Sequence, residues 1–427
     1  MATFSTVFPA DRYGVDPVVL LDGGMGTTLQ APPFELALDS ALWSSELLGT
    51  DEGKAQLTKL HHAWIEAGAD VVETCTYQSS LPLFLNPPST SYTDDQVSTS
   101  LDTMTAALPV AVASCSHSSA ANKQSPVSAL SLGPYGSSLQ PGQEYGGLYP
   151  SPFGPADASY TTPSKAACLS SALEAAPLPL DLVRLPGQAH HEAHLAAWHL
   201  RRLLDFSTSP AFDSPYLPLI AFETVPVLAE ARAIRRAMAA FNAHPSRQGK
   251  QPKAWYISFV FPRVNSDSKE ERVRFPDPAP EVASLPSLAA QADAIVAASF
   301  GDLDSSAGEA YALPGGIGFN CTSPLHAKSV VEALSSALAS ASLSKQGQKP
   351  WLLLYPDGGA TYDVHTRSWH TPEGLTDEKW AVLVADAAQL GREKRVWGGV
   401  AVGGCCKAGP TAIAALGREV RGRGWRE

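Results

Sequence analysis

The chain has 427 residues, a formal net charge of −11 and a hydrophobic content of 44%. This length fits one large α/β domain or two medium ones, with ample apolar material for a buried core. The acidic balance argues against binding to nucleic acid or to an anionic membrane surface.

The sequence also indicates the compartment of the protein. No apolar run approaches the roughly 18 residues of a membrane-spanning helix. The first residues, MATFSTVFPADRYG, lack the basic region and apolar core of a secretory signal. Six cysteines are too few for a disulfide scaffold of this size. We therefore expect a cytoplasmic protein whose thiols stay reduced or bind a metal ion.

Eight short apolar runs are typical of strands that are buried on both faces of a parallel sheet. They lie at 18–21, 70–75, 127–132, 217–222, 254–260, 315–320, 351–355 and 396–402. Longer segments with helical spacing lie between them, at 51–67, 191–206, 227–241, 325–343, 377–390 and 411–420. This alternation predicts a (β/α)8 barrel of the TIM type, with a doubly wound open sheet as the alternative.

The chain is longer than the roughly 250 residues of a plain barrel. Three segments rich in proline or in small polar residues account for the surplus, at 86–123, 150–186 and 262–286. We interpret them as surface loop insertions within a single domain that spans 1–427, rather than as separate domains.

Three cysteines follow the sixth and eighth predicted strands: Cys321, Cys405 and Cys406. Functional side chains gather at the carboxyl ends of the strands in a parallel barrel. Three thiolates there would make a soft tetrahedral zinc site with one position left open. Alternatively, the adjacent pair packs as small buried apolar residues, because the sequence contains no C-x-x-C pair.

Two carboxylates occupy corresponding positions, Asp22 after the first strand and Glu223 after the fourth. They could accept hydrogen bonds from an ammonium group, or they could be helix caps or surface acids. The glycine-rich segment that begins at Asp22 lacks the G-x-G-x-x-G spacing and the P-loop lysine. A nucleotide site is therefore not expected.

Eight motifs are spread almost from end to end of the chain. They are LLDGGMGTTL at 20–29, LWSSELL at 42–48, GADVVETCTYQSS at 68–80, SLGPYGSSLQPGQEYGGLY at 131–149, AFETVPVLAEA at 221–231, GIGFNCTSP at 316–324, LLYPDGGATYD at 353–363 and VGGCCKAGP at 402–410. In this order they resemble the homocysteine S-methyltransferases, which are zinc-dependent (β/α)8 barrels. The resemblance does not cover the insertions that lie between these motifs.

The resemblance implies a role for each motif residue. It makes Cys321, Cys405 and Cys406 the zinc ligands, and it makes Asp22 and Glu223 contacts of the homocysteine amino group. The other substrate-binding residues that it implies are Gly23, Thr27 and Asn320. The nucleophile would be the zinc-bound thiolate of homocysteine, with no nucleophile from the protein itself.

The methyl donor is inferred from departures within the resemblance. The family's usual Tyr-Pro-Asn reads Tyr355-Pro356-Asp357 here, Gln78 stands where the betaine-using branch has an aromatic residue, and the chain ends at Glu427 without that branch's C-terminal arm. These points favour S-methylmethionine as donor. The alternatives are S-adenosylmethionine or betaine, or a non-catalytic barrel that binds zinc or thiols.

Candidate donor-side residues are mostly aromatic, because an aromatic face attracts a sulfonium cation. They are Trp43, Tyr77, Gln78, Tyr135, Tyr145 and Asp357. Ordinary packing at the barrel mouth is the alternative for each aromatic ring. The expected partners are therefore two small molecules, L-homocysteine and a sulfonium methyl donor, while the oligomeric state stays open.

Overall fold

Eight parallel strands form the centre of the molecule. The computed structural model describes residues 3–85, 92–117, 125–139, 141–154, 178–185, 187–264, 272–302, 310–341, 348–363, 368–370 and 374–426. The strands are β1 (Val18–Leu20), β2 (Val71–Glu73), β3 (Val127–Leu132), β4 (Leu219–Val225), β5 (Ala254–Phe259), β8 (Gly316–Asn320), β9 (Trp351–Tyr355) and β12 (Val400–Val402). Each falls within or overlaps a predicted strand.

The strands close into a barrel. They pair in parallel in the order β1-β12-β9-β8-β5-β4-β3-β2, and a parallel bridge between Leu21 and Val71 joins the two ends of the sheet. The predicted (β/α)8 barrel is confirmed, and the open-sheet alternative is wrong. Strands β4, β5, β8 and β9 are buried along their whole length, which explains their continuous apolar character.

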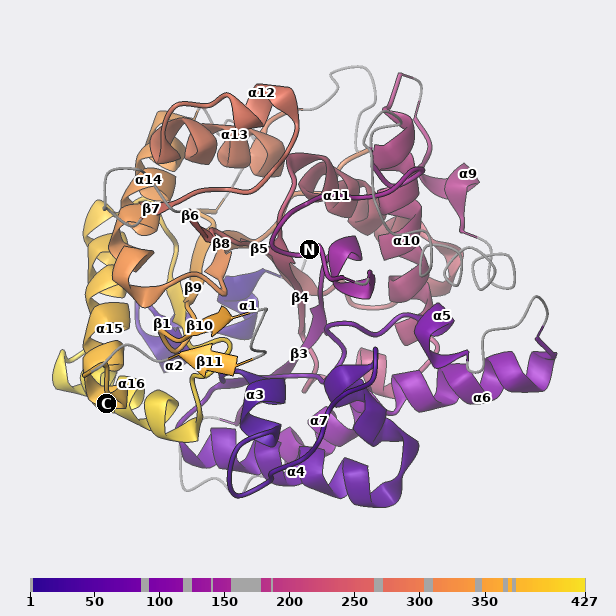
Figure 1. The fold of residues 1–427 in the computed structure, drawn as a ribbon, viewed down its shortest axis with the longest axis horizontal. Helices are drawn as coiled ribbons and strands as arrows, with labels where there is room; N and C mark the ends of the chain where they lie inside the picture. The colour runs from indigo at the N-terminus through magenta and orange to yellow at the C-terminus, as the bar shows by residue number, and fades with distance from the viewer. Residues whose placement is uncertain are drawn as a thin grey trace.

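A ring of helices surrounds the strands (Figure 1). Its members are α4 (Asp51–Glu66), α7 (Ala107–Ser116), α10 (His190–Phe206), α11 (Leu228–Ala243), α13 (Leu288–Phe300), α14 (Ala327–Ser340), α15 (Asp377–Lys394) and α16 (Pro410–Gly422). All six predicted helices are among them. Helix α4 begins where the side chain of Thr50 accepts a hydrogen bond from the Gly53 amide at 3.0 Å, as an N-cap does.

The predicted loop insertion at 86–123 is wrong over 92–117, which forms two helices. Helix α6 (Asp94–Thr105) begins with a capping box at Thr93, and α7 packs against β3 and α4 as a regular barrel helix. The buried residues Ala107, Leu108, Ala111 and Cys115 of α7 recur at helical spacing. The Ser- and Thr-rich composition of the whole segment 86–123 is typical of a loop, and for this reason the helical spacing was not recognised.

The other two predicted insertions are described in part. Within 150–186, the helix α9 (Leu180–Val183) is described, whereas 155–177 and 186 lie outside the described residues. Within 262–286, β6 (Arg263–Val264) pairs antiparallel with β7 (Arg272–Val273), and a short helix α12 (Pro280–Ala283) follows. Residues 265–271 lie outside the described part.

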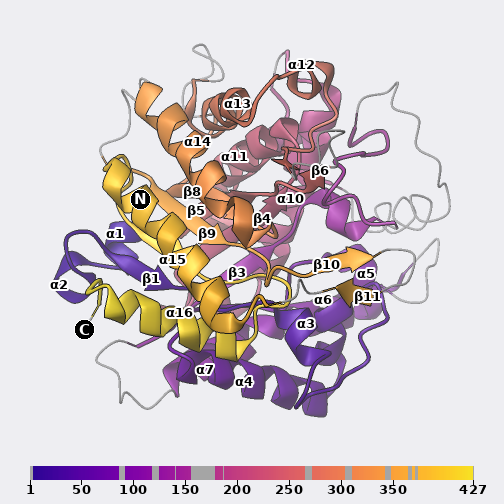
Figure 2. The same cartoon turned by 60° about the vertical axis from the view of Figure 1, so that its left-hand side comes forward.

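The amino end of the barrel is closed by the N-terminal segment. Helices α1 (Phe4–Val7) and α2 (Ala10–Tyr13) lie at this end, opposite the hairpin of β10 (Thr361–Asp363) and β11 (Ser368–His370) (Figure 2). The buried ring of Phe4 packs on Trp351 with a centroid distance of 5.1 Å, and Phe8 packs on the same indole at 5.5 Å. These rings belong to the apolar cluster that fills the barrel interior.

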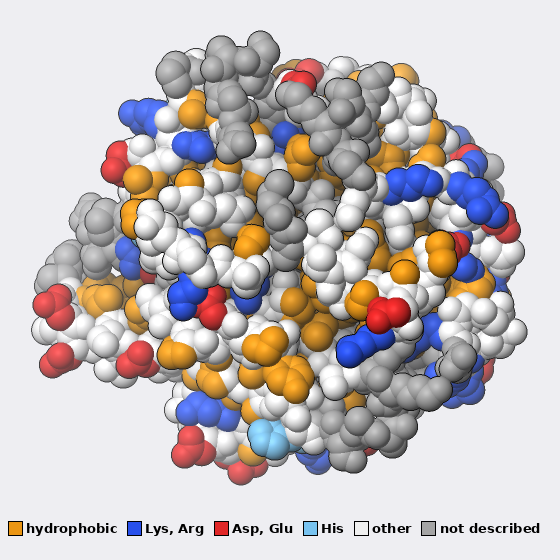
Figure 3. Space-filling model, turned by 180° about the vertical axis from the view of Figure 1, so that it is seen from behind, with side chains coloured by type: hydrophobic (Ala, Val, Ile, Leu, Met, Phe, Trp, Pro, Cys, Tyr) orange, Lys and Arg blue, Asp and Glu red, His pale blue; other side chains and the backbone are white. Residues whose placement is uncertain are grey.

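The outer surface mixes charges of both signs. On the face opposite to that of Figure 1, acidic and basic side chains are interspersed between apolar ones (Figure 3). No helix within the described residues combines the length and the apolar character required to cross a bilayer.

Candidate metal and substrate site

A cavity of about 910 Å³ opens at the carboxyl ends of the strands. Residues that follow β1, β2, β3, β5, β8, β9 and β12, together with Glu223 and Thr224 near the end of β4, line it, so the sequence motifs converge on one place. This is the end of a parallel barrel at which active sites occur.

Three cysteine side chains meet at this cavity. The sulfur atoms of Cys321, Cys405 and Cys406 all lie within 4.8 Å of one another, and we call these residues the cysteine cluster. Cys321 and Cys405 are paired as a disulfide with their Cα atoms 5.5 Å apart, and Cys406 is a free thiol. Burial raises the pKa of the Cys406 thiol to about 12, and the carboxylates of Asp357 and Glu144 act in the same direction.

The loop of Cys405 and Cys406 packs tightly on the loop after β1. A Cβ atom added to Gly24 would lie 2.5 Å from the carbonyl oxygen of Cys405, so only glycine fits there. The hydroxyl of Thr27 accepts a hydrogen bond from the Lys407 amide at 2.8 Å. Gly24 and Thr27 therefore position the cysteine loop, and Gly23 and Thr27, the expected substrate-binding residues, both line the cavity.

Asn320 connects the cysteine cluster to β4. Its Nδ2 donates to the hydroxyl of Thr224 at 2.8 Å and lies 3.6 Å from Sγ of Cys321 and 3.8 Å from Sγ of Cys405. Its Oδ1 accepts from the Thr224 amide at 2.8 Å and from the Ser258 hydroxyl at 2.6 Å. The amide is thus fixed in one orientation, with its donor toward the sulfur atoms.

Backbone strain occurs at the same place. Cys321 has a φ of 48° and Thr224 a φ of 56°, both in the left-handed region that non-glycine residues rarely adopt. The register of β4 against β5 shifts between Phe222 and Val225, so Glu223 lies at an irregularity of the strand. Such irregularities re-aim side chains next to active sites.

Three buried or half-buried carboxyl groups form the second part of the site, and we call Asp22, Glu73 and Glu223 the acid cluster. Asp22 accepts a hydrogen bond from the Glu73 amide at 2.8 Å. Glu223 accepts one from the Ser131 hydroxyl, and Glu73 accepts one from the Tyr256 hydroxyl at 3.0 Å. Glu73 and Glu223 line the cavity, whereas Asp22 lies behind its wall.

The acid cluster is held in an unfavourable electrostatic environment. Burial raises the pKa of Glu73 to about 7. Burial also raises the pKa of Asp22 and of Glu223 well above the usual carboxyl range, and the neighbouring Glu73 carboxylate raises both further. Like charges in a buried site oppose ionisation, and a cation bound between these carboxyl groups would favour their ionised forms.

Most predicted donor-side residues line the cavity. Trp43, Tyr77, Gln78, Tyr145 and Asp357 are all on its wall. The Oε1 atom of Gln78 is buried and has no hydrogen-bond partner among the described residues. Asp357 shapes its own loop, because its Oδ1 accepts a hydrogen bond from the Gly359 amide at 2.7 Å.

The donor-side prediction for Tyr135 is wrong. Its ring is buried, stacks on Phe153 at a centroid distance of 4.0 Å and meets Trp198 edge-on at 5.5 Å, away from the cavity wall. The residue is held by its backbone instead, since its amide donates to Glu230 at 2.6 Å. The ring thus packs in the core against apolar residues of α10 and of the segment after β3.

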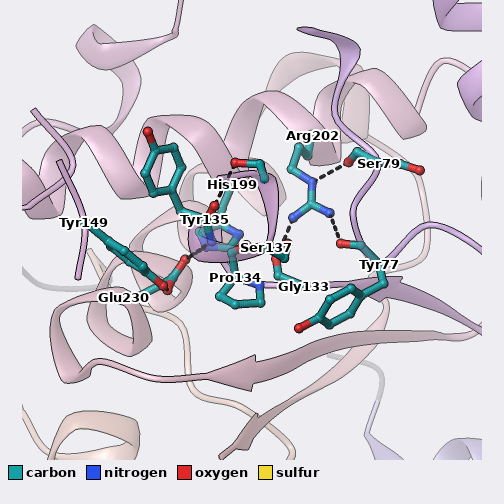
Figure 4. A network of polar contacts seen from close by, with 11 residues as sticks. Tyr77, Ser79, Gly133, Pro134, Tyr135, Ser137, Tyr149, His199, Arg202 and Glu230 are labelled. Carbon is teal, nitrogen blue, oxygen red and sulfur yellow. Dashed lines mark hydrogen bonds and ion pairs between the residues drawn. The ribbon is translucent and has the colours of Figure 1, made fainter. Parts of the chain in front are cut away.

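Tyr135 is part of a buried polar network between α10, α11 and the cavity loops (Figure 4). Arg202 donates to the carbonyl groups of Ser79 and Gly133, both at 2.8 Å, and of Tyr77 at 3.0 Å. On α11, Glu230 accepts from the Tyr149 hydroxyl at 2.6 Å and lies 3.0 Å from Nε2 of His199. The network fixes the loop after β2, which carries Tyr77 and Gln78, and the loop after β3.

Sequence reasoning missed two acidic residues of the site, Glu73 and Glu144. Glu73 ends β2 and was treated as part of a strand, although its place directly before the motif TCTYQ was a signal. Glu144 lies in the PGQEYGG segment, which is part of a motif that carries the resemblance. The resemblance assigned no function to the Glu144 side chain. Both line the cavity.

The cysteine cluster suits a soft metal ion. Three sulfur ligands select zinc or a similar ion over magnesium or calcium, and three protein ligands leave the fourth tetrahedral position for a substrate atom. Once the Cys321–Cys405 pair is reduced to two thiols, the donor set and the proximity of the three sulfur atoms both fit such an ion.

The sequence profile of the family described as homocysteine S-methyltransferase matches residues 19–420. The chain belongs to the homocysteine S-methyltransferase family. It is therefore an enzyme, and methyl transfer to homocysteine is the activity that family membership supports.

Relatives are similar over almost their whole length. Homocysteine S-methyltransferase 4 of Zea mays is 25% identical over 403 residues, which cover 94% of this chain and 89% of the relative. Homocysteine S-methyltransferase YbgG of Bacillus subtilis is 25% identical over 410 residues, or 95% of each chain. Selenocysteine methyltransferase of Astragalus bisulcatus is 24% identical over 416 residues, or 93% and 90% of the two chains.

Solved structures show the same fold. The metallated form of the homocysteine methyltransferase MmuM from Escherichia coli superposes with a TM-score of 0.55 at 19% identity, over 94% of this chain and 96% of that chain. The likeness supports the barrel architecture, and it shows that a protein with this fold takes up a metal ion.

Proposed function

We propose that this protein transfers a methyl group from S-methylmethionine to the sulfur of L-homocysteine, with zinc held by Cys321, Cys405 and Cys406. The observation that carries the proposal is the presence of a three-cysteine cluster and a buried acid cluster at one cavity. A metal ion at the cysteine cluster would bind a thiol, and the acid cluster suits an ammonium group. Homocysteine carries both of these groups. Reduced thiols are needed, so we place the reaction in the cytoplasm.

Zinc, when bound, would supply a Lewis acid that takes up the homocysteine sulfur as a thiolate, which the neutral thiol with a pKa of about 8.5 provides poorly. The protein contributes the arrangement of that site. Asn320 directs its amide hydrogen toward the sulfur atoms of Cys321 and Cys405 and would stabilise their negative charge.

The acid cluster orients homocysteine in this proposal. Glu223 and Glu73 line the cavity and would accept hydrogen bonds from the ammonium group, while Asp22 adds negative charge from behind the wall. A bound cation would lower the raised pKa values of these carboxyl groups. Fixing the amino end sets the direction in which the sulfur points.

The charge of the cavity supports a cationic donor. Its acidic lining residues are Asp39, Glu73, Glu144, Glu223 and Asp357. Among the described lining residues Arg263 is the single basic side chain. S-Methylmethionine carries a net positive charge at neutral pH, whereas betaine carries none, so this field favours the former.

The reaction balances without a protein nucleophile or general acid. A lone pair of the homocysteine sulfur forms a bond to the methyl carbon, and the bond between that carbon and the sulfonium sulfur breaks. The departing sulfur keeps the electron pair and becomes a neutral thioether. One S-methylmethionine cation and one homocysteine thiol give two methionines and one proton.

A donor comparison tests the function. The purified zinc-loaded protein would be incubated with homocysteine and with S-methylmethionine, S-adenosylmethionine or betaine separately, and methionine formation would give kcat/KM for each donor. We expect the highest value for S-methylmethionine, a lower one for the bulkier S-adenosylmethionine and little turnover with betaine. A betaine value equal to or above that for S-methylmethionine would refute the donor assignment.

A metal measurement tests the site. The wild-type protein should contain about one zinc ion per chain, and Cys405→Ala should lose most of the zinc and the activity. Cys115→Ala, a buried cysteine of α7 outside the cysteine cluster, is the matched control and should keep both. Full activity in zinc-free wild-type protein would refute zinc dependence.

A further inference from the structure

Glu144 places a carboxyl group on the cavity wall apart from the acid cluster. It belongs to the segment after β3, whose backbone is tied down by two hydrogen bonds. The Gln143 amide donates to the Gly136 carbonyl at 2.9 Å, and the Gly147 amide donates to the Gln143 carbonyl at 2.8 Å. The residue is therefore held in a defined position at the cavity.

One oxygen of the Glu144 carboxylate lacks a hydrogen-bond donor within the described part of the chain. This Oε2 atom is buried and accepts no hydrogen bond from any residue that the structure describes. Burial raises the pKa of this carboxyl group, as expected for an acid without a neighbouring cation. A carboxylate oxygen that is buried without a donor is costly, so such an atom at a cavity indicates a ligand that supplies the missing donor.

The local sequence makes room for this arrangement. A Cβ atom added to Gly142 would lie 2.4 Å from Oε2 of Glu144, so a larger residue there would push the carboxylate away. Glycine at this position allows the side chain to fold back beside its own loop.

Tyr77 lies within electrostatic reach of both acidic parts of the cavity. Burial raises the pKa of its hydroxyl, and the carboxylates of Glu144 and Glu223 raise it further. Besides Asp39 and Asp357, the cavity thus has acidic residues at the acid cluster and at Glu144, the latter on the side of Tyr145 and Cys406. The acid cluster and Glu144 are two separate places that suit an ammonium group.

We propose that Glu144 binds the ammonium group of the methyl donor, so that the enzyme selects a sulfonium that is also an α-amino acid. This inference rests on the proposed function and deepens it. Homocysteine would use the acid cluster, and the donor would use Glu144, with the cysteine cluster on the cavity wall that both share. A plain sulfonium without an amino group would lack this contact.

Separate binding measurements test the assignment. S-Methylmethionine and homocysteine would each be titrated alone into zinc-loaded protein by calorimetry, so that no turnover occurs. Glu144→Gln removes the charge and keeps the shape, and it should weaken S-methylmethionine about 10- to 100-fold while homocysteine changes less than about twofold. Glu46→Gln, the same change at an exposed residue that does not line the cavity, should alter neither.

The outcomes separate the two proposals. An unchanged S-methylmethionine affinity in a folded Glu144→Gln protein overturns the assignment of Glu144, as does an equal or greater loss for homocysteine. If the wild-type protein binds and methylates homocysteine from S-methylmethionine in those cases, the proposed function survives. If wild-type protein does not bind S-methylmethionine, the proposed donor and this inference both fail.

Discussion

Glu73→Gln is expected to stabilise the protein while it weakens substrate binding. The substitution keeps the shape of the side chain and can retain a contact with the Tyr256 hydroxyl, which now lies 3.0 Å from Oε1. It removes a carboxyl group whose ionised form is opposed by burial. The KM for homocysteine should rise about tenfold, because one acceptor for the ammonium group loses its charge.

The size of the stabilisation follows from the pKa shift of Glu73, from 4.5 to about 7. Below pH 4.5 the folded and unfolded states both hold the proton, and this residue contributes nothing. Between pH 4.5 and about 7 only the folded state holds it, so the free energy of unfolding falls as the pH rises. The full shift of about 2.5 pKa units corresponds to at most about 3 kcal/mol, reached above pH 7.

Urea denaturation of ligand-free protein between about pH 5 and pH 8 measures this effect. The difference in free energy of unfolding between Glu73→Gln and wild type should be small near pH 5 and greatest near pH 8. Glu46→Gln, at an exposed position, should follow the wild type at every pH. A difference that does not change with pH, or a variant that is less stable than wild type at pH 8, would refute the reasoning.

Three further substitutions examine separate parts of the structure. Asn320→Asp removes the amide donor that lies 3.6 Å from Sγ of Cys321. Zinc binding, measured in competition with a chelator, should weaken about 10- to 100-fold. An unchanged zinc affinity would contradict the role of the Asn320 amide at the cysteine cluster. Arg202→Met leaves several buried carbonyl groups without a donor and should lower the free energy of unfolding by about 2–4 kcal/mol in urea denaturation, whereas no loss would show that other donors replace it. Phe8→Ala should lower it by about 3–5 kcal/mol with zinc content unchanged; a loss below about 0.5 kcal/mol would contradict its place in the core.

The barrel was predictable because its strands are buried on both faces. Runs such as that of β9 are apolar at every position, and their number and alternation with helices already indicated eight strands. Helix α13 was missed for the related reason that it shows little contrast between its faces, with seven of its thirteen residues buried. Helix α7 was not predicted because its buried face consists mostly of small residues, which show little contrast with the Ser- and Thr-rich residues around it.

The site was predictable where a motif supplied the chemistry. Cys321 meets Cys405 and Cys406 as the resemblance implied, although it lies 84 residues before Cys405 in the sequence. The separation of Tyr135 from the cavity could not be predicted, because an aromatic residue after a strand end suits both the mouth and the surrounding core. Glu73 could not be assigned either, because its pKa depends on burial and on neighbours from other strands.

The closed amino end of the barrel has a kinetic consequence. Because the N-terminal aromatic rings fill that end, both substrates and both products of the proposed reaction pass through one opening. Homocysteine, bound at the acid cluster, would lie farther inside than a donor bound at the partly exposed Glu144. In initial-rate measurements, excess donor should accordingly inhibit in competition with homocysteine, and a lack of such competition would contradict this difference in depth. The initial rate should then fall at high donor concentration, because a donor that binds first prevents homocysteine from reaching the acid cluster.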